Sequence, residues 1–203
     1  MDIIQLIKDI VTIIATVAGA IIAGYGVDTW RKQLKGKTEY ELARRFLKAV
    51  YKLREAIKIV RNPFIPSGEI YQALIDDGFS KEEIEKDETK ILSRQDLVYI
   101  KRWEYINKAN SNLKVEILEA EVIWGEEIKE LTDELWKCIS LLNLNLTRYQ
   151  RQQNNTRDYS RERMEEIEKV IWDDGDSDEN FFTNKIETAI SEIENFLKPH
   201  LKL

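Results

Sequence analysis

The chain of 203 residues is long enough for one domain, or for one domain with an appendage. Its 33% charged residues and its few glycines (8) and prolines (3) favour helices over sheets. A formal net charge of −6 argues against a general nucleic-acid binder, which needs a surplus of Lys and Arg. The single Cys138 excludes an intrachain disulfide, and its apolar helical context predicts a buried thiol in a reducing compartment.

Residues 10–27 form an uncharged apolar stretch of 18 residues, IVTIIATVAGAIIAGYGV. This is close to the roughly 20 residues that cross a bilayer core. Its eight Ile and Val residues contribute roughly −2.5 to −5 kcal/mol to insertion. We therefore predict a transmembrane helix. One alternative is a cleaved signal peptide, which the acidic start Met1-Asp2 disfavours. The other is the core helix of a soluble protein.

Residues typical of the membrane–water interface lie at the C-terminal end of this stretch and just after it. The expected anchors are two aromatic rings and the basic residues of a juxtamembrane connector over 31–37, namely Tyr25, Trp30, Arg31, Lys32, Lys35 and Lys37. Lys8 is the one basic residue before the stretch. The positive-inside rule therefore places the N-terminus outside and residues 38–203 in the cytoplasm. We expect a single-pass protein of the cell's inner or plasma membrane, with residues 1–30 as the N-terminal tail and spanning helix.

Small and weakly polar residues recur along one face of this stretch. They are Thr12, Thr16, Gly19, Ala23 and Gly26, and Asp9 continues the face outward. Bulky aliphatic side chains occupy the opposite face. Because helices in lipid associate through small residues, we expect homo-oligomerisation through this face. A further hypothesis is that the same face lines a pore, with Asp9 at its outer mouth.

Two capping-box patterns predict helix starts in the next segment. Thr38 and Glu41 form the first, just after Gly36, so we expect a break there and a new helix that runs to about Val60. Asn62-Pro63 ends that helix, because the residue before proline avoids the α region. The second pattern lies in the less regular segment 63–93.

In that segment, Ser80 and Glu83 predict a short acidic helix. The acidic run that follows is interpreted as a solvated face, with a docking surface for a basic partner as the alternative.

Residues 94–152 show a helical seam of apolar residues with one shift at Gly125. We predict one long helix with a kink or a tight corner at Gly125, and consider a hairpin at residues 110–112 as an alternative. Shorter helices follow at 160–172 and 179–197. The expected fold class is all-α: a single N-terminal transmembrane helix and a cytoplasmic helical bundle built on this long helix.

The search for catalytic chemistry finds little. The only histidine, His200, lies near the end of the chain, so histidine-based catalysis and histidine-containing metal sites are not expected. Two acidic constellations offer weak metal hypotheses: a glutamate group around Gly125, formed by Glu116, Glu119, Glu126, Glu127 and Glu130, and a loop at 173–180. In the loop, a cap by Ser177 or Asp178 is the competing interpretation. We therefore predict no cofactor, no metal and no enzymatic activity.

Arginines and tyrosines alternate around residue 150. The group consists of Arg148, Arg151, Arg157, Arg161 and Arg163 with Tyr149 and Tyr159. Such residues can bind single-stranded nucleic acid, but pairing with the chain's own acidic surface or with a partner is the preferred interpretation.

Taken together, these patterns predict a membrane-anchored interaction protein that self-associates and binds an unknown cytoplasmic protein, with no nucleic-acid partner. The alternatives are an oligomeric membrane effector or small channel gated by the bundle, a soluble cytosolic adaptor, and an enzyme that uses carboxylates alone.

Overall fold

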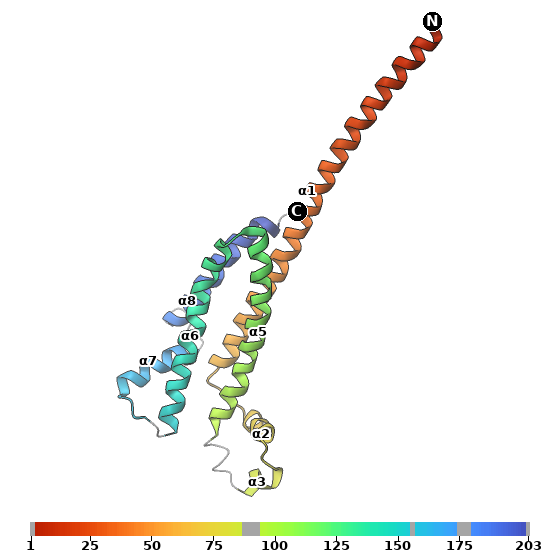
Figure 1. The fold of residues 1–203 in the computed structure, drawn as a ribbon. Coiled ribbons are helices and arrows are strands. Elements are labelled where there is room, and N and C mark those ends of the chain that lie inside the picture. The colour runs from red at the N-terminus through yellow and green to blue at the C-terminus, as the bar shows by residue number, and fades with distance from the viewer. Residues whose placement is uncertain (1–2, 87–93, 155–156, 174–179, 202–203) are drawn as a thin grey trace.

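The computed structural model describes residues 3–86, 94–154, 157–173 and 180–201. In this part of the chain it contains seven α-helices and no strand. A very long first helix, α1 (Ile3–Arg61), projects from one end of a helical bundle, as Figure 1 shows. The all-α prediction is confirmed.

The break predicted at Gly36 and Thr38 is wrong, because α1 continues through the connector 31–37 without interruption. The Thr38 hydroxyl donates to the carbonyl of Leu34, one turn earlier, at 3.0 Å and caps nothing. Ion pairs between residues four apart bridge the connector: Lys32–Asp28 at 2.7 Å, Lys35–Glu39 at 3.7 Å and Lys37–Glu41 at 4.0 Å. Such pairs favour helix, and one glycine costs only about 1 kcal/mol.

Helix α1 ends at Arg61, just before Asn62-Pro63, as predicted. Two short helices follow, α2 (Ser67–Asp76) and α3 (Lys81–Lys86). The second capping box is confirmed, since the Ser80 hydroxyl accepts from the Glu83 backbone N–H and the Glu83 carboxylate accepts from the Ser80 backbone N–H. A small apolar cluster joins α2 and α3 to the start of α5 (Gln95–Trp124).

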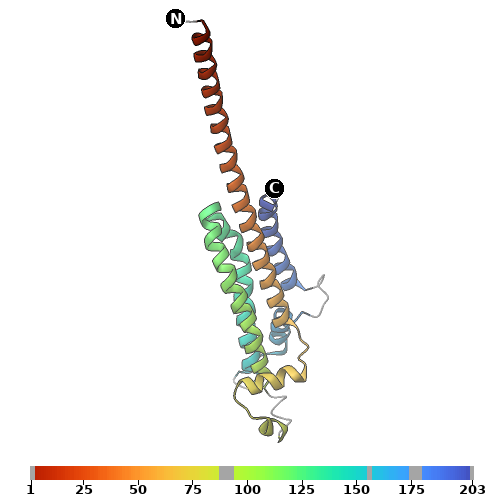
Figure 2. The same ribbon diagram turned by 90° about the vertical axis from the view of Figure 1, so that its right-hand side faces the viewer.

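The prediction of one long helix over 94–152 is wrong. The chain forms two antiparallel helices, α5 and α6 (Glu127–Gln153), and the tight corner predicted at Gly125 is where they meet. Gly125 has φ +87° and ψ −170°, a conformation that essentially only glycine adopts. Residues 110–112 lie inside α5, so the alternative hairpin is also wrong. The apolar seam then folds back on itself (Figure 2).

The bundle consists of four long segments: the C-terminal part of α1, α5, α6 and α8 (Phe181–Leu197). Helix α1 packs on α5 and α8, and α6 packs on the same two helices, so the four enclose one core. Phe46, Leu113, Leu135 and Phe182 are fully buried there. Cys138 is 1% exposed, as predicted, and burial raises the pKa of its thiol.

A buried arginine joins the end of α7 (Arg161–Ile171) to the start of α8. Ser160 caps α7 and the side chain of Asn180 caps α8, whereas the predicted caps Ser177 and Asp178 lie outside the described residues. The Arg61 side chain, 2% exposed, donates to the carbonyls of Val170 (2.9 Å) and Trp172 (2.9 Å), to the Thr183 hydroxyl (2.7 Å) and to Asn180 (3.3 Å). The last residue of α1 thereby holds these two helix ends together.

Candidate functional site

Two surfaces of α1 stand out, and the first is its apolar N-terminal part. Every residue from 10 to 27 is exposed, with Ile14 at 63% and Ile22 at 71%. An 18-residue window of this helix has a mean hydropathy of 2.1, and none of it is buried. It is therefore not a core helix of this bundle. By length and composition it suits a membrane anchor or a signal sequence.

The small-residue face of α1 lies on the side of the helix away from the bundle. At about 100° per residue, Thr12, Thr16, Gly19, Ala23 and Gly26 fall within an arc of about 80°. The bulky residues Ile14 and Ile21 share a side with Phe46 and Leu53, which are buried in the bundle. A Cβ added at Gly19 or Gly26 would meet no atom within 4 Å. The bundle therefore leaves the small-residue face unobstructed. The side chain of Asp9 lies outside the described residues.

The hydroxyls on this face are bonded within their own helix. Thr12 donates to the carbonyl of Lys8, and Thr16 donates to the carbonyl of Thr12, each at 2.8 Å. Both bonds are of the kind that leaves the hydroxyl oxygen free to accept a further hydrogen bond.

The predicted interface residues are all exposed on α1. Tyr25 is 74% and Trp30 62% exposed. Among the basic residues, Lys32, Lys35 and Lys37 each have a carboxylate partner one turn away. Sequence reasoning missed these pairs, although the spacing of four residues was visible, and they reduce the net positive charge of the connector.

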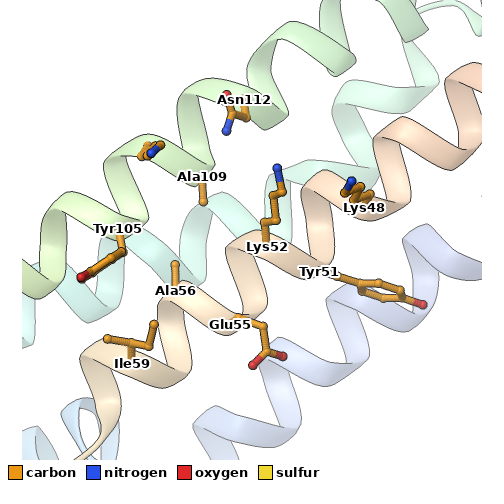
Figure 3. Close-up of a pocket in the computed structure, with 10 residues that line it drawn as sticks. Lys48, Tyr51, Lys52, Glu55, Ala56, Ile59, Tyr105, Ala109 and Asn112 are labelled. Carbon is orange, nitrogen blue, oxygen red and sulfur yellow. The ribbon is translucent and has the colours of Figure 1, made fainter.

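The second surface is a groove between α1 and α5, with a volume of about 480 Å³. Figure 3 shows the side chains that line it, which are Lys48, Tyr51, Lys52, Glu55, Ala56, Ile59, Tyr105, Lys108, Ala109 and Asn112. Its floor consists of the small residues Ala56 and Ala109, which are 4% and 6% exposed. At one end Ile59 and Tyr105 present apolar surface, being 41% and 55% exposed. We call this surface the α1–α5 groove.

The α1–α5 groove continues toward the N-terminal end of the bundle. A second hollow of about 340 Å³ shares Lys48, Lys52 and Asn112 with it and adds Arg45, Ala49, Val115 and Glu116. Between residues 45 and 59, α1 rises about 21 Å. The groove is therefore about four helical turns long.

Three lysines of the groove have no ion-pair partner. Lys48, Lys52 and Lys108 are exposed, and none forms an ion pair with a carboxylate of the described residues. The other charged groups in and beside the groove are paired: Arg45 binds Glu116 and Glu119, and Arg54 binds Glu55. The groove thus combines apolar walls with three unpaired ammonium groups.

Tyr51 lies at the edge of the groove away from α5, and its ring points toward α8 (Figure 3). Its hydroxyl donates to the carboxylate of Glu194 on α8 at 2.8 Å, and the guanidinium of Arg54 lies over its ring. Burial and then this hydrogen bond raise the pKa of Tyr51. The hydroxyl therefore stays protonated at neutral pH and holds the ring in place.

The predicted glutamate group around Gly125 does not form. Glu116 and Glu119 bind Arg45, whereas Glu126 and Glu127 lie beyond the corner. No group of three His, Cys, Asp or Glu residues in the described ranges could hold a metal ion. In the acidic loop, residues 174–179 lie outside the described residues, while Asp173 pairs with Arg61 and Asn180 caps α8.

The arginine–tyrosine group divides into two parts. Arg161 and Arg163 pair with Glu165 and Glu166, as the preferred interpretation predicted, and Tyr149 is buried edge-on against Tyr99 and Trp172. Arg148, Arg151, Arg157 and Tyr159 line a polar surface hollow of about 400 Å³ on α6 and the following loop. Burial of Tyr149 removes one of the two rings that base stacking would need.

His200 packs against the bundle, although its position near the end of the chain did not predict contacts with the fold. Its ring is 4.8 Å from that of Trp124, and its Nδ1 is 3.3 Å from a carboxylate oxygen of Glu39. These contacts hold the C-terminal turn, η1 (Lys198–Leu201), on α1 and the α5–α6 corner.

Comparison with protein families, with curated proteins and with solved structures finds no match for this chain. The two surfaces of α1 are therefore the features from which a function is proposed.

Proposed function

We propose that this chain is a membrane-anchored, non-enzymatic interaction protein. Its residues 10–27 span the cell's inner or plasma membrane once, with the N-terminus outside and the bundle in the cytoplasm. The supporting observation is the complete exposure of this apolar stretch on a helix that is continuous with the bundle. Soluble proteins rarely leave such a contiguous apolar surface in water.

The orientation follows from the charges that flank the stretch. Arg31 and the lysines of the connector resist translocation, whereas only Lys8 precedes the stretch. The connector lysines pair with Asp28, Glu39 and Glu41, but acidic residues contribute little to the positive-inside rule, so the orientation does not change.

Self-association of α1 is the second part of the proposal. The small-residue face lies on the side of α1 opposite its buried residues, and no atom of the bundle lies near Gly19 or Gly26, so a second spanning helix can approach this face. Thr12 and Thr16 keep acceptor capacity toward a second helix. An oligomeric effector or small channel is the alternative function, and its supporting observation is the pair of hydroxyls, Thr12 and Thr16, on the face that contains Gly19.

The anchor is tested by fractionating cells and washing the membranes with alkaline carbonate. We expect the full-length protein to remain in the membrane pellet and to leave it only with detergent. Recovery in the soluble fraction would contradict the anchor and favour a soluble adaptor.

Self-association is tested with Gly19→Leu and with the matched control Val17→Leu, which changes the opposite face. We expect Gly19→Leu to abolish cross-linked oligomers in detergent micelles, and Val17→Leu to leave them unchanged. Equal oligomer yields from both variants would contradict association through the small-residue face. If the protein permeabilises vesicles and Gly19→Leu abolishes that leakage, the result would support an oligomeric effector or small channel and contradict a protein that acts only as a membrane anchor.

A further inference from the structure

We propose that the α1–α5 groove binds an acidic amphipathic helix of a cytoplasmic partner protein. This inference names the partner chemistry for the interaction function proposed above. It rests on the groove's shape, its apolar surface and its three unpaired lysines.

The shape fits a helix. Alanines at 49 and 56 on α1 and at 109 on α5 are almost completely buried, so they leave a shallow channel where the two helices meet. The channel is about four turns long, which suits a helix of about 14 residues. An amphipathic helix bound in a groove places apolar residues at intervals of three and four along its floor.

The apolar surface determines one face of the ligand. Ile59 and Tyr105 stand on opposite sides of the channel, on α1 and α5, as Figure 3 shows, and both are substantially exposed. The hydrogen bond from Tyr51 to Glu194 on α8 fixes the edge of the groove away from α5, so this edge needs no reordering when a ligand binds. Rigid aromatic side chains at a groove lose little entropy when they make contacts.

The charge determines the flanks of the ligand. Lys48, Lys52 and Lys108 have no carboxylate partner among the described residues, although their cationic neighbours do. Carboxylates on both sides of an apolar stripe would complement them, and such complementarity steers association and selects partners.

Other occupants fit less well. The α1 side of the groove begins about 30 Å beyond Val27 along the helix axis, which is outside the reach of the headgroups of the anchoring membrane. Lys48 lies about ten helical turns after Thr12, so the groove and the small-residue face lie on the same side of α1. Two copies associated through that face would turn their grooves toward each other, and the lysines of one copy would repel those of the other. Nucleic acid would leave the apolar floor unused.

The test uses the full-length protein in a mild detergent and a fluorescein-labelled helical peptide of 18 residues. The peptide carries Leu at every third or fourth position, Glu on both flanks and Ala elsewhere. We expect a saturable rise in fluorescence anisotropy, and at least tenfold weaker binding when Gln replaces the Leu residues. No saturable binding of the acidic peptide, or equal binding of the Gln peptide, would overturn the proposal.

Protein variants locate the binding site. The triple variant Lys48→Glu, Lys52→Glu, Lys108→Glu should weaken binding at least tenfold. The matched control Lys58→Glu, Lys81→Glu, Lys86→Glu alters net charge equally at exposed lysines outside the groove, and should change the Kd less than threefold. Ile59→Ser with Tyr105→Ala keeps the charge and should also weaken binding at least fivefold. Equal effects of the two triple variants would overturn the groove as the site.

Competition separates the other ligand classes. Single-stranded DNA and phosphatidylserine vesicles should not displace the peptide at moderate salt; displacement by either would assign the groove to nucleic acid or lipid and overturn the proposal. Because the titration is carried out in detergent, its outcome is independent of whether the protein is anchored in cells.

Discussion

The two parts of α1 contain similar apolar side chains in opposite surroundings. Ile14 and Ile22 are more than half exposed, whereas Leu42, Phe46 and Leu53, further along the same helix, are fully buried. In the second part the apolar residues occupy one side, and charged residues such as Lys48 and Lys52 occupy the other. In residues 10–27 apolar residues lie all round the helix. A one-sided pattern needs a protein neighbour on one side, and an all-round pattern is typical of a helix that is surrounded by protein or by lipid.

The largest expected effect comes from substitutions that make insertion of residues 10–27 into a membrane unfavourable. Ile14→Arg with Ile21→Arg adds roughly 5–7 kcal/mol to the cost of insertion, which exceeds the roughly −2.5 to −5 kcal/mol that the aliphatic residues contribute. We expect the variant to leave the membrane pellet while its bundle keeps native helicity by circular dichroism. Ile14→Leu with Ile21→Leu is the control and should stay in the membranes. Loss of the folded bundle in the arginine variant would show that the two parts of α1 are not independent.

The next largest effect concerns Arg61, the last residue of α1, in the part of the helix that is buried in the bundle. Arg61→Ala removes the buried donor of the Val170 carbonyl and leaves the Trp172 carbonyl only the longer bond from Asn180, and we expect a loss of about 3–5 kcal/mol in the free energy of unfolding. Urea unfolding in detergent measures it. Arg54→Ala, on the same helix, removes an ion pair with Glu55 and a contact with the Tyr51 ring, and should cost less than about 2 kcal/mol. Similar losses for both variants would contradict the role given to the Arg61 contacts.

A smaller effect tests the corner that brings α6 back along the bundle. Gly125→Ala forces a Cβ into a backbone conformation that costs about 1–3 kcal/mol for other residues. The matched control is Gly68→Ala, in helix α2, where the added methyl meets no atom within 4 Å and alanine is the better helix former. Thermal unfolding should show a lower Tm for Gly125→Ala only. An unchanged Tm would mean that the corner tolerates a side chain.

The smallest effect tests the continuity of α1 between its two parts. Thr38→Ala should change stability by less than about 0.5 kcal/mol, because its hydroxyl bonds within an uninterrupted helix. Asn180→Ala should cost about 1 kcal/mol, because that side chain caps α8. Urea unfolding of both variants decides the matter: a loss of 1 kcal/mol or more at Thr38 would indicate that a new helix starts there.

Local patterns in the sequence were sufficient for several features of this protein. The all-α fold, the apolar stretch 10–27, the stop at Asn62-Pro63 and the capping box at Ser80 all depend on residues within a few positions of one another. Their physical causes, which are hydropathy, backbone restriction and capping hydrogen bonds, act over the same short range. The proposed anchor residues and the small-residue face rest on patterns of the same short range.

Tertiary structure alone decided the rest. Gly36 and Gly125 look alike in the sequence, yet the first stays inside a helix supported by ion pairs, and the second turns the chain back because α6 gains a core against α8. The α1–α5 groove joins residues that are about 50 positions apart, and the Arg61 network joins residues more than 100 positions apart. Which lysine lacks a partner, and which arginine is buried, depends on packing between distant segments. Periodicity along one helix contains no information on these contacts.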